Sequence, residues 1–340
     1  MFPIKNDPES RASVRRKVML DNKTIYKRTL TFSIHRLLWD MLTLLLAAVL
    51  CVAGFVIADK TAGKGIIGLV IGAVVALILA IILTRFISYR YKAGQIAMMT
   101  KGITEGELPE DVLGEGRQIV KERFVTVAAF FAATGVIKGI FNQIGRGITK
   151  AGESLGGDTG GAVGGAVSTV LQTIVNYLCD CCLGWVFYRK GVGAMKATCE
   201  GAVLFFKHGK TFAKNMGRVF GIGLATLIPI GGVFGGIAYL IMSRFPGAFE
   251  SLNQSLIKMA EEGAKIPQWL TNPSTLMIAC AALVGLLFWS MIHSVFIRPF
   301  VLVGVLRNYI NSGMNDIPSE ESFKLLDGKS KKFREAHAKI

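Results

Sequence analysis

Residues 156–190 read GGDTGGAVGGAVSTVLQTIVNYLCDCCLGWVFYRK, and this stretch indicates the fold of the chain. Its first half repeats glycine at a four-residue period, at Gly156, Gly160 and Gly164, with Gly165 following the last of these. Because residues four apart share one face of a helix, these glycines form a smooth ridge where another helix backbone can approach closely. The pattern predicts a tightly packed helix, with a flexible glycine-rich linker as the alternative for residues 152–162.

The second half of the stretch carries polar residues at the same helical spacing. Gln172, Asn176 and Asp180 follow one another at intervals of four and precede the basic pair Arg189-Lys190. We interpret residues 159–188 as a membrane span with a polar seam, because an acid inside a span usually faces the helix bundle or water. The expected partners of Asp180 are His293 or Arg298. The seam either lines a cytoplasm-facing cavity or is a structural hydrogen-bonded contact between helices.

Composition favours a membrane protein. Apolar residues make up 51% of the 340-residue chain, charged residues only 18%, and the mean hydropathy is +0.47. The net charge of +16 is distributed between apolar runs, as the positive-inside rule predicts, rather than gathered in one patch. We therefore expect a lipid bilayer with anionic headgroups as the partner, and no nucleic acid, although the basic first forty residues leave a nucleic-acid arm as the competing interpretation.

The apolar runs predict an all-α polytopic integral membrane protein with about six transmembrane helices and both termini cytoplasmic. The expected regions are a basic cytoplasmic arm (1–40), a two-span helical hairpin (41–92), a charged cytoplasmic connector (93–123), a four-span core (124–306) with a cytoplasmic loop at 189–218 and an external loop at 244–273, and a basic cytoplasmic tail (307–340).

Two regions leave alternatives open. Residues 124–142 are short for a span, and charge alternation favours a crossing there over a re-entrant or interfacial helix. Residues 93–123 mix acids and bases with glycines and predict two short helices with a turn near Leu108–Pro109. That segment is either a docking or gating element or a solvated connector.

The predicted span over 219–243 contains Pro229 and Gly232 near its middle. Proline removes a backbone hydrogen bond and neighbouring glycines tolerate unwinding, so a broken helix is expected here. A broken helix at membrane depth can bind ions or polar solutes through its freed backbone groups. A packed kink without binding is the alternative.

Catalytic and metal motifs are not found in the sequence. Cys179, Cys181 and Cys182 lie close together, but no His/Cys set with zinc spacing completes them, and apolar filler or acylation accounts for them. Neither a Ser/His/Asp set nor a dinucleotide motif is present. We expect no metal, no cofactor and no enzymatic activity.

Four short motifs stand in the second half of the chain: the cysteine-rich 179–182 segment, the basic aromatic stretch at 206–215, the pair Arg307-Asn308 with Gly313 downstream, and the segment Leu325–Lys329. With these motifs the chain resembles choline transporter-like membrane proteins. The resemblance covers residues 175–332. A member of this family is expected to be a polytopic helical transporter, so the resemblance implies transport.

These observations predict a membrane transporter or solute-binding permease for a small polar or cationic solute, in the plasma (inner) membrane. Its expected solute pathway contains Gln172, Asn176, Asp180, Pro229, Gly232, His293 and Arg298. The alternative is a non-enzymatic oligomeric scaffold or pore component, a homo-oligomer or membrane complex, that docks partners through the glycine ridge and the basic arms.

Overall fold

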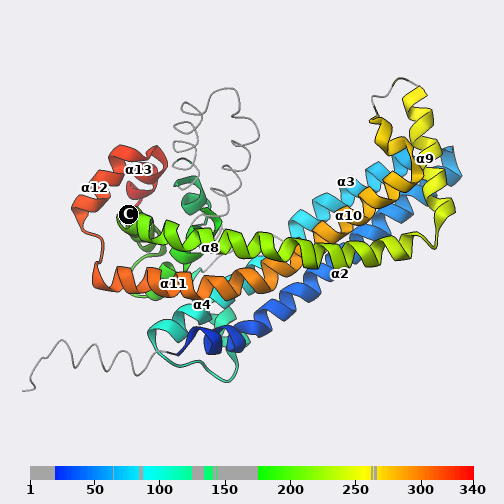
Figure 1. Cartoon of the computed structure of the whole chain (residues 1–340). Helices are drawn as coiled ribbons and strands as arrows, with labels where there is room; N and C mark the ends of the chain where they lie inside the picture. Colours follow the sequence, from blue (N-terminus) through cyan, green and yellow to red (C-terminus); the bar gives the residue numbers. More distant parts are fainter. Residues whose placement is uncertain are drawn as a thin grey trace, which may run out of the picture. The chain divides into compact units, whose positions relative to one another are not determined.

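The structure, a computed structural model, describes residues 20–63, 65–83, 87–124, 134–140, 143, 175–261, 263 and 266–340, and every regular element among them is helical. The elements in chain order are α2 (Asn22–Ala62), α3 (Gly65–Leu83), α4 (Tyr89–Thr104), α5 (Val112–Arg123), helical segments at 134–140 and 175–188, α8 (Ala194–Met242), α9 (Pro246–Glu261), the short 3₁₀ helix η3 (Gln268–Thr271), α10 (Pro273–Ile292), the π-helical turn η4 (His293–Ile297), α11 (Arg298–Asn315), α12 (Glu320–Lys329) and α13 (Lys331–His337) (Figure 1). The all-α expectation is confirmed.

The chain divides into two compact units. Unit 1 comprises Met1–Ser33, Arg90–Phe220 and Arg298–Ile340, and unit 2 comprises Ile34–Tyr89 and Gly221–Ile297. The chain therefore passes between the units four times, and α2 and α8 each contribute residues to both.

The first hairpin of unit 2 is made by α2 and α3. Gly63, with a φ of +62°, ends α2 in the left-handed conformation that glycine adopts without strain. The two helices pack backbone to backbone, because a Cβ at Gly68 would lie 2.0 Å from the Gly54 carbonyl oxygen. The α2–α3 pair lies in the region expected as a hairpin over 41–92, although α2 already begins at Asn22.

The second hairpin of unit 2 is made by the C-terminal half of α8 and by α10. Its connection contains α9 (Pro246–Glu261) and η3, within the segment expected as an external loop. The Asn272 side chain begins α10 by accepting hydrogen bonds from the backbone N–H groups of Ser274 (3.0 Å) and Thr275 (3.3 Å). Gly285 of α10 meets the α8 backbone so closely that a Cβ there would lie 2.3 Å from the Gly231 carbonyl oxygen.

Unit 2 exposes its apolar side chains. Among the residues described, all but four of the large hydrophobic side chains with exposed surface belong to this unit, including Ile228 at 81% and Leu77 at 61%. Three helices, at Asn22–Ala62, Gly221–Met242 and Pro273–Asn315, are long and apolar enough to cross a membrane, and Ile67–Leu83 is a shorter apolar helix. The chain is therefore compatible with a membrane protein, while the expected number of six spans is not confirmed.

Unit 1 buries its apolar side chains instead. Its core contains Trp185, Tyr309 and Phe32, each with no exposed surface. The helix at 175–188 is buried in this unit along 177–187, so its apolar surface is covered by protein. Helix α4 contributes Met98 and Met99 to the same interior.

The end of the chain is folded into unit 1 rather than extended. Helices α12 and α13 pack Phe323 and Phe333 against Ile140 and against Cys199 of α8. Ser330 begins α13, and its hydroxyl hydrogen-bonds the Gln143 side chain at 3.0 Å.

Helix α8 is continuous through Pro229. It runs for 49 residues from Ala194 to Met242 with this proline inside it. The expected break of the span at this position is not present in the structure. The proline removes one backbone donor, and the surrounding turns of α8 nevertheless remain helical.

Candidate functional site

One buried carboxylate in unit 1 is held by two basic side chains from other helices. Asp180, on the helix at 175–188, is 4% exposed. Its Oδ1 lies 2.6 Å from the Nζ of Lys92 on α4, and its Oδ2 accepts a hydrogen bond from the Nη2 of Arg298 on α11. A buried charge is tolerated only where it is paired and hydrogen-bonded, and here two cations share one acid.

Arg298 makes further contacts with the helix at 175–188. Its Nη2 donates to the carbonyl oxygen of Asn176 at 3.0 Å, and its guanidinium carbon lies 5.2 Å from the centre of the Tyr177 ring. The geometry is that of a cation–π contact. We call Lys92, Tyr177, Asp180 and Arg298 the Asp180 cluster. The predicted pairing of Asp180 with Arg298 is found, and Lys92 is the partner that sequence reasoning missed.

A second buried carboxylate in unit 1 is held by hydrogen bonds from the end of the helix at 175–188 and the residue that follows it. Glu200 of α8 is 2% exposed and receives two hydrogen bonds from Arg189, at 2.8 and 3.0 Å, and one from the Trp185 indole at 3.1 Å. These hydrogen bonds raise the pKa of Arg189 above its ordinary value. The bidentate pair satisfies the acid within the fold and ties α8 to the end of the helix at 175–188.

Unit 2 has polar contacts of its own on α2. The guanidinium of Arg36, a residue only 9% exposed, donates from Nη1 to the carbonyl oxygen of Ser294 at 3.5 Å. One turn further along α2, Asp40 accepts a hydrogen bond from the Ser88 hydroxyl at 3.4 Å. These residues were not among the predicted site residues. Their i, i+4 spacing next to an apolar run was the signal that could have found them.

The two serines connect these contacts to the Asp180 cluster along the chain. Lys92 lies four residues after Ser88, and Arg298 lies four residues after Ser294. Both segments contain π-helical geometry, at 87–88 and in η4. π-Helical turns are rare and occur frequently at functional sites.

His293 belongs to unit 2 and has aromatic surroundings there. Its ring lies against Trp289, tilted by 32° with centroids 5.3 Å apart, and its Nε2 would lie 3.3 Å from a Cβ at Gly223. The Trp289 indole donates to the hydroxyl of Thr226 at 3.3 Å. These contacts place His293 beside α8 and α10 in unit 2, whereas Asp180, with which it was expected to pair, belongs to unit 1.

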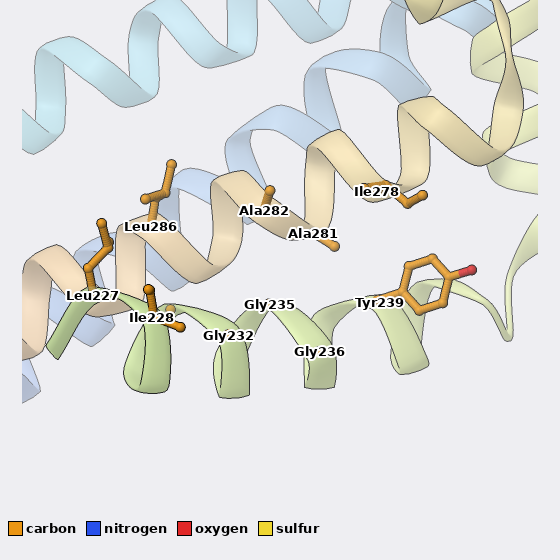
Figure 2. A pocket seen from close by; sticks show the side chains of 11 residues that line it. Leu227, Ile228, Gly232, Gly235, Gly236, Tyr239, Ile278, Ala281, Ala282 and Leu286 are labelled. Atoms are coloured by element: carbon orange, nitrogen blue, oxygen red, sulfur yellow. The ribbon is translucent and has the colours of Figure 1, made fainter. Parts of the chain in front are cut away.

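A groove of about 640 Å³ lies between α8 and α10 in unit 2 (Figure 2). Gly232 and Gly236 form its bare side, since a Cβ at either would meet nothing within 4 Å. Figure 2 shows Tyr239 and Ile278 facing one another at one end of the groove. Tyr239 supplies the one polar side chain of this lining, so the groove suits an apolar occupant.

The remaining expected residues either lie outside the described part of the chain or are cysteines that no further metal ligands join among the described residues. Gln172 and the predicted ridge of Gly156, Gly160, Gly164 and Gly165 lie outside the described residues. Cys179, Cys181 and Cys182 are buried free thiols, and no group of three metal ligands occurs among the residues that the structure describes.

The comparisons with known proteins give no family for this chain. It matches no protein-family model, no curated protein and no solved structure.

Proposed function

We propose that this protein is a membrane transporter or solute-binding permease for a small polar solute. The observation that carries the proposal is the Asp180 cluster, in which one buried acid holds the basic residues that follow two exits from unit 2. Two of the four passages between the units lead within three residues to Lys92 and Arg298, so a conformational change in the hairpins of unit 2 would act on both basic residues along the chain.

A buried ion cluster favours a moving protein over a rigid support. Replacing buried ion pairs by apolar packing is often neutral or stabilising, so such pairs are weak devices for stability alone. The π-helical turns at 87–88 and in η4 add local hinges on the same two segments. Hinges next to a breakable charge cluster are the elements that a two-state carrier requires.

The charge of the cluster narrows the solute. Two cations and one acid leave one excess positive charge, which disfavours a cationic solute at this position. The sequence alone left polar and cationic solutes open, and we now propose a neutral polar or an anionic one.

We further propose that the described residues form four spans in the plasma (inner) membrane and that unit 1 lies on the cytoplasmic side. An arginine lies within three residues of each of the four passages between the units, at Arg36, Arg90, Arg218 and Arg298. Only seven of the 39 Lys and Arg residues belong to unit 2, namely Arg36, Lys60, Lys64, Arg85, Arg244, Lys258 and Lys265. This asymmetry follows the positive-inside rule.

Solute flux into proteoliposomes tests the proposal. The wild-type protein is expected to move at least one member of a panel of labelled neutral and anionic solutes. Lys92→Met is expected to lower that flux about tenfold, which is the fold-change that a typical coupling energy between two sites produces. Lys332→Met, on an exposed lysine paired with Glu335, is the matched control and leaves the flux unchanged. Absence of flux for the whole panel, or equal flux in folded Lys92→Met, contradicts the proposal.

The alternative function, an oligomeric membrane scaffold, is favoured by the bare groove side at Gly232 and Gly236, because glycine faces let helices of another subunit approach closely. Stoichiometry measured in detergent separates the two. A high-order ring that loses its assembly in Gly236→Leu supports the scaffold, and a monomer or dimer supports the carrier.

A further inference from the structure

The Asp180 cluster carries more positive than negative charge. Among the described residues, it combines the cations Lys92 and Arg298 with the single carboxylate of Asp180. Lys138, on the helix at 134–140, is close enough for its charge to act on the neighbouring Cys179. The surroundings of the helix at 175–188 therefore favour an additional anion.

Two hydrogen-bond donors in the cluster have no acceptor among the described residues. The hydroxyl of Tyr177, a residue 1% exposed, is buried without a partner, and so is the Nε of Arg298. A buried donor that stays unsatisfied costs free energy, and such groups in native structures usually have an unseen water or ion as a partner. Both donors belong to residues already in contact, since the Arg298 guanidinium lies over the Tyr177 ring.

We propose that the Asp180 cluster binds a phosphate group, with Tyr177 and Arg298 as hydrogen-bond donors and Lys92 at its solvent side. The Lys92 side chain is 33% exposed and that of Arg298 is 21% exposed, so the ligand enters past the lysine. A phosphate offers several strong acceptor oxygens to a guanidinium, an ammonium and a phenol at once. One such anion neutralises the excess charge and satisfies both unpaired donors.

The phosphate group could come from the headgroup of an anionic phospholipid or from free phosphate. The position of Arg298 in the chain favours the headgroup. Arg298 lies six residues after Ile292, where the apolar helix α10 ends. Basic pockets at the cytoplasmic ends of membrane helices commonly bind anionic headgroups. This site goes beyond the proposed transport function and does not depend on it.

Tyr177→Phe gives the sharpest test, because it removes the unpartnered hydroxyl and keeps the ring under Arg298. We would measure the thermal unfolding and the binding affinity of the full chain in uncharged detergent. The probes are short-chain phosphatidylglycerol, short-chain phosphatidylcholine and inorganic phosphate. Tyr188→Phe, on the same helix with its ring against Trp185, is the matched control.

The wild-type and Tyr188→Phe proteins are expected to bind phosphatidylglycerol more tightly than phosphatidylcholine. Tyr177→Phe is expected to bind it about tenfold more weakly, as for the loss of one hydrogen bond to a charged group. If Tyr177→Phe weakens the binding of inorganic phosphate as much as that of phosphatidylglycerol, the site is supported and free phosphate is a ligand of it. Unchanged phosphatidylglycerol affinity in Tyr177→Phe, or no preference for either anionic probe, overturns the proposal. Tyr177→Phe removes an unsatisfied group and so is expected to remain folded.

Discussion

The two units differ in where their apolar side chains lie. In unit 1 the large apolar side chains lie inside, and Trp185, Tyr309 and Phe333 have no exposed surface. In unit 2 the apolar side chains of α3 and α10 point outward, with Leu77 at 61% and Leu283 at 60% exposure. Such a surface is costly in water at roughly 25 cal/mol per Å², so the exposed side chains of unit 2 are compatible with a hydrocarbon environment.

An apolar helix is not by itself evidence of a membrane span. The helix at 175–188 is nearly free of charge, as α3 is, yet other helices of unit 1 cover it. A helix that is apolar all round is buried either in a protein core or in a bilayer. Ion pairs tell the two apart, because unit 1 places Asp180 and Glu200 inside against basic partners.

The largest expected effect comes from Asp180→Asn in unit 1. The substitution leaves Lys92 and Arg298 partly buried without their shared acid. Breaking a buried pair from one side typically costs about 3–5 kcal/mol of folding free energy. Chemical denaturation in detergent, followed by tryptophan fluorescence of the buried Trp185, measures it.

Glu335→Gln is the control for that prediction, since this exposed acid lies 3.1 Å from the exposed Lys332. Exposed pairs contribute little, so the unfolding transition is expected to stay in place. Equal stability of Asp180→Asn and the wild type would show that the Asp180 cluster does not hold unit 1 together.

The next effect compares two glycines of unit 2 that differ only in what faces them. A Cβ at Gly285 would lie 2.3 Å from the Gly231 carbonyl oxygen, whereas a Cβ at Gly232 would meet nothing within 4 Å. A Cβ at Gly285 would meet backbone atoms of Gly231 and Gly235, which cannot move aside as a flexible side chain can. Gly285→Leu is therefore expected to destabilise the second hairpin by about 1–3 kcal/mol. Gly232→Leu is expected to be tolerated in the monomer.

Thermal unfolding of both variants in the same detergent decides this prediction. If Gly232→Leu is as damaging as Gly285→Leu, the groove between α8 and α10 is filled in the native protein by another helix. That outcome would favour the oligomeric scaffold over the carrier.

Part of this architecture was readable from the sequence. The helical class of the chain and the two short helices on either side of Leu108–Pro109 were predicted from its apolar runs and from the glycines and proline of residues 93–123. These features depend on local turn chemistry and on periodicity, which neighbouring residues decide. The pairing of Asp180 with Arg298 was also predicted, because a buried acid restricts the choice of partner.

The rest depends on tertiary contacts that no local pattern records. Lys92 reads as a charge at a membrane exit, and only the fold brings it to Asp180. Pro229 predicted a break, yet α8 stays helical through it. Burial of the helix at 175–188 within unit 1 was missed because hydropathy is the same for a core and for a span.

A smaller effect separates the two solvents directly. Leu77 in unit 2 and Leu325 in unit 1 are similarly exposed, at 61% and 64%. In liposomes, a water-soluble maleimide is expected to label Leu325→Cys readily and Leu77→Cys at least about tenfold more slowly, because the thiolate is the reactive form and hydrocarbon suppresses it.

The labelling experiment uses a background with Cys51→Ala and Cys280→Ala, since those two thiols are only half-buried. The other cysteines are buried, and burial raises the pKa of Cys199 to about 12, so it stays unreactive near neutral pH. Equal labelling rates at Leu77→Cys and Leu325→Cys would mean that water, not lipid, surrounds α3.

The smallest effect concerns a surface ion pair of unit 1, where water should screen it. Lys207 lies 2.6 Å from Asp316, and its hydrogen bond holds the pKa of Asp316 below the ordinary value of 3.8. A lowered carboxyl pKa stabilises the fold above the ordinary value, and this stabilisation is lost as pH falls below 3.8 through the folded-state pKa. Lys207→Met is thus expected to lower the unfolding temperature slightly at neutral pH, with the difference from the wild type shrinking in acid and in high salt. A difference that persists in high salt would show that the pair is shielded from water, and unit 1 would then share the non-aqueous surroundings that we assign to unit 2.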